Sequence, residues 1–384
     1  MARVYLDYNA TAPLRPAARM AMAAALEAVG NPSSVHTEGR AAHALVEEAR
    51  TRVAGLVGGG AGLTTFTSGG SEANNTVLTP AWSRAGKPCP VEILLVGATE
   101  HPSVLAGGRF PPDRAKTIPV DGDGVVDLDR LEAMLATANG QTLVSVMAAN
   151  NETGVVQPVA EVARIAHAAG ALVHTDAVQA AGRVAVDIGS LGVDVLTLSA
   201  HKIGGPQGAG AIVRADEALT FAPLVTGGGQ ERRLRAGTEN VTAIAGFGAA
   251  AEAALADLAK AERWAGWRDR LAAIVGGERT STVFGRSAER LPQTLCIAIA
   301  RVPAETLVIA LDLAGVAVSS GSACSSGKVA PSHVLAAMGV PAGLARCAIR
   351  LSLGWQSAES DLDSFATAWR GVVKHIAPGD VVAA

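Results

Sequence analysis

Short apolar runs alternate with Ala-rich amphipathic segments from about residue 40 to residue 250. The runs are predicted to be buried parallel strands, and residues 159–169 are predicted to form a helix between two of them. This alternation is typical of βαβ units, in which helices cover both faces of a mostly parallel sheet, so it predicts an α/β fold. The predicted strands are residues 92–96, 143–148, 171–174, 195–198 and 209–213.

The pattern changes after residue 250. A long helical pattern covers residues 242–275, with Gly266 as the point where a break would fall. Residues 294–299 and 347–353 are then predicted to be strands, and residues 305–313, 332–337 and 359–375 are predicted to be helices. We therefore predict a second, smaller domain in the C-terminal part of the chain.

Composition narrows the possible classes of function. The chain has 384 residues, which is long for one hydrophobic core, and 49% of them are hydrophobic. The formal net charge is −3 and no run of Lys or Arg is present, which argues against a nucleic-acid or membrane surface. The N-terminal residues do not resemble a signal peptide, and no uncharged apolar stretch of about 18 residues predicts a membrane span. We expect a soluble cytoplasmic protein.

An acid and a lysine follow two of the predicted strands. Asp176 comes just after residues 171–174, and Lys202 follows residues 195–198. Ligands bind beyond the carboxyl ends of the strands in such a sheet, so both side chains are expected at one ligand site. A pyridoxal-phosphate enzyme needs this pair, because the lysine forms a Schiff base with the cofactor and the acid keeps the pyridine nitrogen protonated. Either residue alone would more often be an ordinary surface residue.

Three further segments follow predicted strands in the same way. Gly70 and Ser71 open a helical segment, and a helix N-terminus attracts phosphate, although a short Gly/Ser turn is weak evidence by itself. It is not a P-loop, because no Gly-Lys-Ser/Thr follows. His101 would cover a cofactor face, and Asn151 would hold a cofactor or substrate oxygen. Five loops that converge on one sheet edge are harder to dismiss than any one of them.

One of the four cysteines lies in a chemically distinctive segment. Cys324 is surrounded by small polar residues within 318–327, which predicts an exposed, mobile loop with a reactive thiol. Cys296 and Cys347 lie in apolar runs and are predicted to be buried strand residues, and Cys89 is predicted to lie in a loop without a role. No C-x-x-C pair is present, so we expect neither a structural metal site nor a disulfide framework.

Arg350 is a charged residue within a predicted apolar strand. A buried guanidinium needs a partner, and a substrate carboxylate matches its planar fork. The alternative is a structural ion pair, which would be favoured if the rest of the pattern were absent.

Taken together, these motifs resemble the cysteine desulfurases of the class V pyridoxal-phosphate aminotransferase family, in the branch of the nitrogen-fixation and iron–sulfur-cluster enzymes. The short cysteine motif resembles that of the group with a mobile cysteine loop. The matching segments run through nearly the whole chain: residues 5–11, 30–34, 67–69, 100–101, 150–154, 201–202, 227–231, 235–238 and 319–325.

The resemblance implies fold type I, with a mainly parallel seven-stranded sheet in a large domain (residues 13–258) and a smaller α+β domain (residues 1–12 and 259–384). It implies pyridoxal 5'-phosphate as cofactor, L-cysteine as substrate, Lys202 as the cofactor-bearing residue and Cys324 as the nucleophile that receives sulfur as a persulfide. The remaining implied site residues are Asp176 at the pyridine nitrogen, Gln179 at the phenolic oxygen, His101 on the ring, Gly70, Ser71, Ser199 and His201 at the phosphate, Thr238 at the phosphate from a partner subunit, and Asn151 and Arg350 at the substrate.

The resemblance also implies a homodimer and a sulfur-acceptor protein such as an iron–sulfur scaffold, with Cys324 in transient contact with a cluster and no resident metal. Selenocysteine lyase or another class V aminotransferase or lyase is the alternative enzyme, because a fold does not fix an activity. A non-enzymatic protein that keeps the fold is a second alternative. The Cys324 segment favours desulfuration, because a transaminase does not need it.

Overall fold

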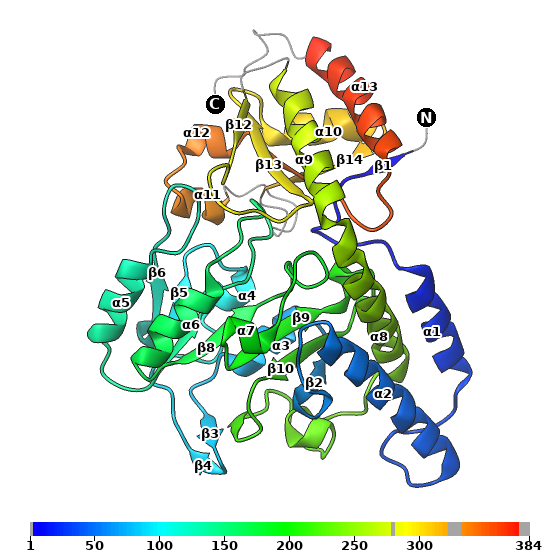
Figure 1. Ribbon diagram of the computed structural model, residues 1–384, viewed down its shortest axis with the longest axis vertical. Coiled ribbons are helices and arrows are strands. Elements are labelled where there is room, and N and C mark those ends of the chain that lie inside the picture. Colours follow the sequence, from blue (N-terminus) through cyan, green and yellow to red (C-terminus); the bar gives the residue numbers. More distant parts are fainter. Residues whose placement is uncertain (1–2, 278–280, 322–331, 376–384) are drawn as a thin grey trace.

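A computed structural model describes residues 3–277, 281–321 and 332–375. The chain forms a larger part built on a seven-stranded sheet and a smaller part built on a four-stranded sheet (Figure 1). The strand order of the large sheet is β2-β10-β9-β8-β7-β5-β6. Its strands are β2 (Thr64–Thr67), β5 (Ile93–Gly97), β6 (Ala115–Ile118), β7 (Thr142–Ser145), β8 (Leu172–Asp176), β9 (Val195–Ser199) and β10 (Gly210–Arg214).

The mostly parallel sheet predicted from the apolar runs is confirmed, with one correction. The strand predicted at residues 209–213 is present as β10, but it runs antiparallel to both β9 and β2. Residues 200–209 connect β9 to β10, and that connection is shorter than the helical crossover that a parallel pair requires. The chain therefore turns back beside β9, and β10 forms one antiparallel strand in the sheet.

Helices cover both faces of the large sheet. Neighbouring strand residues alternate between two hydrophobic clusters: Val144 and Val173 pack in one cluster, and Leu143 and Leu172 pack in the other. This is why the strand sequences are continuously apolar and do not alternate with polar residues. The helices of this part are α1 (Pro16–Glu27), α2 (Thr37–Gly55), α3 (Gly70–Val77), α4 (Pro102–Leu105), α5 (Leu128–Ala136), α6 (Val159–Ala168), α7 (Ile188–Leu191) and α8 (Val241–Ala256).

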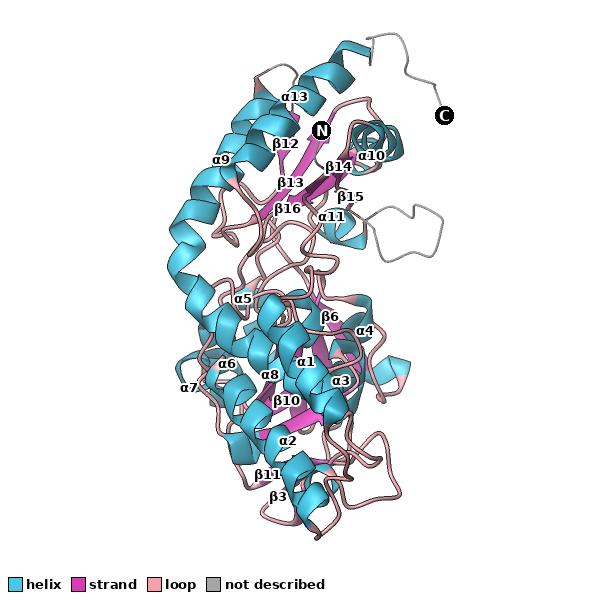
Figure 2. Cartoon of the chain, turned by 90° about the vertical axis from the view of Figure 1, so that its right-hand side faces the viewer, coloured by secondary structure: helices cyan, strands magenta, loops and turns pink. Residues whose placement is uncertain are grey.

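A long helical arm leads from the large sheet to the small one (Figure 2). It consists of α8, a 3-10 turn at Asp257–Lys260 and α9 (Ala261–Gly276). The break predicted at Gly266 is wrong, since that residue lies inside α9. By length and composition Val241–Gly276 could cross a membrane, but 61% of its apolar window is buried inside the protein, as in the core helix of a folded domain.

The small sheet places Arg350 on the side that faces the large sheet. Leu295 and Ile297 of β13 pack in one cluster, whereas Cys296 between them packs in another. Arg350 pairs with Cys296 across the sheet, and so it points away from the Leu295 side. The sheet order is β12-β13-β16-β15, formed by β12 (Ser281–Val283), β13 (Thr294–Ile299), β16 (Ala348–Ser352) and β15 (Ser319–Ser320).

The N-terminus joins this smaller part. Strand β1 (Val4–Tyr5) pairs in parallel with β14 (Val316–Ala317), and the following residues pass along the edge of the large sheet. The remaining helices are α10 (Ala304–Leu313), α11 (His333–Ala337), α12 (Ala342–Ala345) and α13 (Glu359–His375), and a small outlying sheet holds β3 (Trp82–Arg84), β4 (Lys87–Pro88) and β11 (Leu219–Phe221).

Candidate active site

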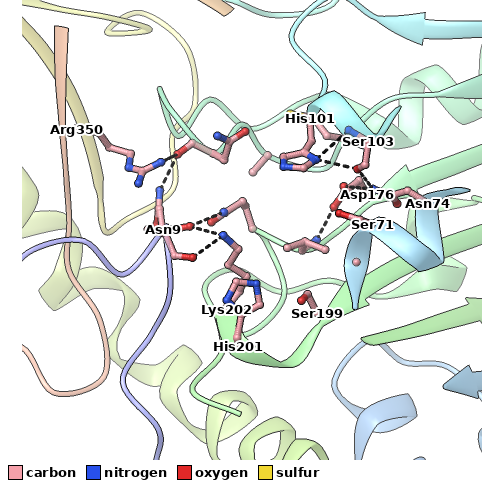
Figure 3. Close-up of a pocket in the computed structure, with 17 residues that line it drawn as sticks. Asn9, Ser71, Asn74, His101, Ser103, Asp176, Ser199, His201, Lys202 and Arg350 are labelled. Atoms are coloured by element: carbon pink, nitrogen blue, oxygen red, sulfur yellow. Dashed lines mark hydrogen bonds between the residues drawn. The ribbon is translucent and has the colours of Figure 1, made fainter. Parts of the chain in front are cut away.

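A cavity of about 280 Å³ lies beyond the carboxyl ends of the central strands, where the large sheet meets Arg350 of the small one (Figure 3). This is the position at which parallel sheets bind ligands. The structure therefore brings together most of the residues that the sequence singled out. Those that line the cavity are Gly70, Ser71, His101, Asn151, Asp176, Gln179, Ser199, His201, Lys202 and Arg350.

Asp176 is a buried carboxylate held by neutral donors. It ends β8, and it accepts hydrogen bonds from Asn74 Nδ2 at 2.7 Å and from the Val178 backbone N–H at 2.9 Å. It forms no salt bridge with a Lys, Arg or His of the described residues, although only 6% of its surface is exposed. A buried negative charge without a cationic partner is costly, so the site suits a ligand that brings a positive charge to Asp176.

Lys202 lies across the cavity from Asp176, on the 3-10 turn that follows β9. Its Nζ donates to the backbone carbonyl of Asn9 at 2.6 Å and to that of Ala10 at 2.9 Å. The N-terminal segment thus fixes the amine at the cavity wall. The carbonyl of Asn9 also accepts from Gln179 Nε2 at 3.1 Å, so one backbone group orients two side chains of the site.

One end of the cavity is suited to an anion. Helix α3 begins at Gly70 without a side-chain cap, which leaves first-turn N–H groups available to a ligand. The hydroxyl-bearing residues Ser71 and Ser199 line the same cavity. A Cβ on Gly70 would lie 3.1 Å from Val178 Cγ2, so glycine permits the close packing of α3 here. Burial and the nearby Lys202 lower the pKa of His201 to about 4, so its ring is neutral at pH 7.

His101 caps the short helix α4. Its Nδ1 accepts from the Ser103 backbone N–H at 3.2 Å and lies 2.8 Å from Ser103 Oγ. Burial lowers the pKa of the imidazole, and the nearby Asp176 opposes that effect only in part. The ring is therefore neutral at pH 7.

Arg350 forms the ion pair that the sequence left open as its structural alternative. Its NH2 donates to Asp7 Oδ1 at 2.8 Å, and its NH1 donates to the backbone carbonyl of Asn151 at 3.0 Å. Its Nε is buried and has no hydrogen-bond partner in the described part of the chain. The guanidinium also lines the cavity, so it keeps capacity for a ligand carboxylate beside Asp7.

Two residues that position the site were missed from the sequence. Asn9 donates from Nδ2 to Thr294 Oγ1 at 2.9 Å and to the Asn151 carbonyl at 3.1 Å, and it lines the cavity. Asn74 holds Asp176 from inside α3. The sequence did mark Asn74 as unusual, because Asn74 and Asn75 are adjacent asparagines inside a helical segment and asparagine is a poor helix former. Asn9 follows only the two-residue strand β1, which no long apolar run marks in the sequence, so its position gave no such signal.

Two of the predicted site residues are not at this cavity. Thr238 is exposed and lines a separate hollow with Phe66, Ser68 and Arg235. The structure holds a single chain, so the expected contact of Thr238 with a partner's cofactor stays a prediction. Cys324 lies outside the described residues, and its expected role as the nucleophile also stays a prediction.

Comparison with known proteins decides the family. The model of the family "Aminotransferase class-V" matches residues 4–365. A cysteine desulfurase of Cereibacter sphaeroides is 45% identical over 370 residues, which cover 94% of both chains. The cysteine desulfurase IscS of Dictyoglomus turgidum is 41% identical over 94% of this chain and 92% of that protein. The chain belongs to the class-V aminotransferase family, among its cysteine desulfurases.

The fold of this cysteine desulfurase agrees with the assignment. The solved structure of a NifS-like protein from Rickettsia africae superposes with a TM-score of 0.86 at 34% identity, and it covers 97% of this chain and 99% of that one. The family uses pyridoxal phosphate. The residues present fit that group, because an uncapped helix N-terminus, a lysine amine and a buried carboxylate surround one cavity.

Proposed function

We propose that this cysteine desulfurase converts L-cysteine to L-alanine and transfers the substrate sulfur to Cys324 as a persulfide. The observation that carries the proposal is the placement of Lys202, Asp176 and Arg350 around one cavity. The first two provide the amine and the acid that pyridoxal phosphate needs. Arg350 adds a guanidinium that suits the carboxylate of an amino acid.

We propose the following contacts for pyridoxal phosphate. Lys202 would bear the cofactor, Asp176 would pair with the pyridine nitrogen, and Gln179 would donate to the phenolic oxygen. The phosphate would lie at the N-terminus of α3 with Gly70, Ser71, Ser199 and His201, and His101 would cover the ring. When bound, the cofactor acts as an electron sink for the electrons released at the substrate Cα.

The protein's own groups then carry the proton and sulfur transfers. Lys202 Nζ removes the α-proton of the substrate, while Arg350 and Asn151 hold the substrate carboxylate. The Cys324 thiolate attacks the substrate sulfur, so a sulfur–sulfur bond forms as the carbon–sulfur bond breaks. Return of a proton to the substrate carbon gives L-alanine. The persulfide leaves by attack of an acceptor thiol, which requires an accessible sulfur.

The expectations about domains and partners fit this proposal. We place a large domain at residues 13–258 and a small domain at residues 1–12 and 259–384, supported by the two sheets and their separate hydrophobic clusters. We propose a cytoplasmic homodimer, in which Thr238 serves the partner's site. An iron–sulfur scaffold would be the acceptor, with Cys324 in transient contact with its cluster.

The purified protein with pyridoxal phosphate, L-cysteine and a thiol reductant should release alanine and sulfide in equal amounts. Equal amounts are expected because each turnover moves one sulfur and leaves one carbon skeleton with its amino group. Amino-acid analysis and a sulfide assay measure both products. A 2-oxo acid in place of alanine would indicate a transaminase. Turnover of L-selenocysteine but not of L-cysteine would indicate a selenocysteine lyase.

Replacement of Arg350 by Gln should raise the KM for L-cysteine about tenfold or more while the cofactor stays bound. The reason is that a hydrogen bond to a charged group contributes roughly 1.5–3 kcal/mol, and about 1.4 kcal/mol is a tenfold change in binding. Steady-state kinetics and the cofactor absorption band measure the two effects.

Asp7→Asn is the matched control, because it removes the charge that Arg350 pairs with but keeps the guanidinium. It should leave the KM much closer to that of the wild type. Equal KM values for the two variants would mean that Arg350 serves only the ion pair with Asp7.

A further inference from the structure

A chain of polar side chains runs from the cavity wall into the large sheet and links five elements of that region. It includes two residues proposed to touch the cofactor, Asp176 and His101, and it joins them through groups that the proposed mechanism does not use (Figure 3). The members of the chain are Ser145 on β7, His174 and Asp176 on β8, Thr197 on β9, Asn74 on α3, Ser103 on α4 and His101 at the cap of α4.

The ionised Asp176 fixes the orientation of the Asn74 amide. A carboxylate only accepts, so the group that lies 2.7 Å from Asp176 Oδ2 must be the Asn74 NH₂. The Asn74 Oδ1 then faces Thr197 Oγ1 at 2.6 Å, and the threonine hydroxyl must donate to it. A flipped amide would place Oδ1 against the carboxylate and leave the threonine proton without this acceptor. Asn74 is 1% exposed, so water does not compete.

The same logic continues to His174. Thr197 Oγ1 gives its proton to Asn74, so it accepts from His174 Nε2 at 3.1 Å. His174 Nδ1 is then the acceptor for the Ser145 hydroxyl at 2.8 Å. Burial lowers the pKa of His174 to about 3, so the imidazole stays neutral. His174 therefore brings no positive charge behind Asn74.

The second hydrogen of the Asn74 amide controls the His101 side. It donates to Ser103 Oγ at 2.9 Å, so the Ser103 hydroxyl is directed toward His101 Nδ1, 2.8 Å away. The Ser103 backbone N–H approaches the same nitrogen. His101 Nδ1 is thus an acceptor, and the neutral ring carries its proton on Nε2. The other charged groups that bear on this ring are Asp176, which favours its protonation, and Lys202 and His333, which oppose it.

We infer that Asn74 is a positioning residue that couples Asp176 to His101, an inference that rests on the proposed function. One amide holds the carboxylate in place through one hydrogen, and through the other it directs the Ser103 hydroxyl at His101 Nδ1. Two groups proposed to contact the cofactor are therefore set by one side chain at the cavity wall.

Asn74→Ala should lower the affinity for pyridoxal phosphate about tenfold or more, because it removes a hydrogen bond to a buried carboxylate. It should also raise the pKa of His101, because the Ser103 hydroxyl is released and becomes an acceptor for a proton on Nδ1. Cofactor titration measures the first effect. The second is measured on ¹⁵N-histidine-labelled enzyme by NMR across a pH series, with a His101→Gln sample to assign the resonance.

Asn75→Ala is the matched control, because Asn75 is the same residue type one position along α3 and, among the described residues, its side chain donates to the Ser71 carbonyl and not to Asp176 or Ser103. It should change neither quantity. Thr197→Val provides a second, nearly isosteric test: it removes the hydroxyl that holds the Asn74 amide and should shift both quantities in the same direction by less. If both Asn74→Ala and Thr197→Val match the control in cofactor affinity and in the His101 titration, the inference is overturned.

Different results would contradict the proposed function and this inference. Wild-type enzyme that makes no alanine from L-cysteine contradicts the function, whereas the His101 titration still tests the hydrogen-bond chain. Wild-type turnover, together with unaltered cofactor affinity and an unaltered His101 titration in both Asn74→Ala and Thr197→Val, contradicts the inference alone.

Discussion

The Lys202→Ala variant is expected to lose cysteine desulfurase activity by at least about 10³-fold, because general acid–base catalysis alone contributes roughly 10²–10⁴-fold and the covalent anchor is lost as well. Its amine is held at the cavity wall by two backbone carbonyls, and alanine leaves no group there that takes the α-proton. Alanine release from L-cysteine measures the loss.

Lys116→Ala is a suitable control, because Lys116 is exposed on β6 and away from the cavity. It should keep wild-type activity. Borohydride reduction of the wild-type enzyme, followed by peptide mapping, should find the cofactor on the peptide that contains Lys202. A cofactor fixed to another lysine would remove Lys202 from this role.

The Cys324→Ala variant is expected to separate cofactor binding from sulfur transfer. It should bind pyridoxal phosphate and respond spectrally to L-cysteine, because Lys202 and Asp176 are unchanged. It should release neither alanine nor sulfide above background, because no thiol receives the substrate sulfur. Absorption spectra and product assays on the same sample measure the two parts.

The other three cysteines serve as controls, and the structure explains why. Cys296 is fully buried, and burial raises the pKa of its thiol, so it does not supply a thiolate. Cys347 is buried and donates to the Gly343 carbonyl. Cys89 lies beside the outlying strand β4 and does not line the cavity. Replacing any of them by alanine should preserve activity in a folded protein.

Much of the site could be predicted because its residues follow strands. Apolar runs mark buried strands, and polar residues at or shortly after the end of such a run lie at the edge where ligands bind. Asp176, His101, Asn151 and Lys202 follow this rule, and all four line the cavity. Arg350 could be singled out in the sequence for a different reason, because its charge interrupts an apolar strand.

The rest depends on tertiary contacts that a local pattern does not contain. Asn9 reaches the site because the N-terminal segment passes the sheet edge, and no periodicity marks that path. The antiparallel direction of β10 follows from the length of its connection, whereas its composition is the same as that of a parallel strand. The helical arm breaks at Asp257–Lys260 instead of Gly266, since glycine is tolerated inside a helix.

The central claim is that Cys324 carries the substrate sulfur, and it is tested most directly by mass spectrometry of the wild-type enzyme after a brief pulse of L-cysteine. The account predicts one extra sulfur atom per chain, on the peptide that contains Cys324, and its disappearance after treatment with a thiol reductant. An extra sulfur on Cys89, Cys296 or Cys347, or alanine formation while Cys324 never carries sulfur, would contradict the account.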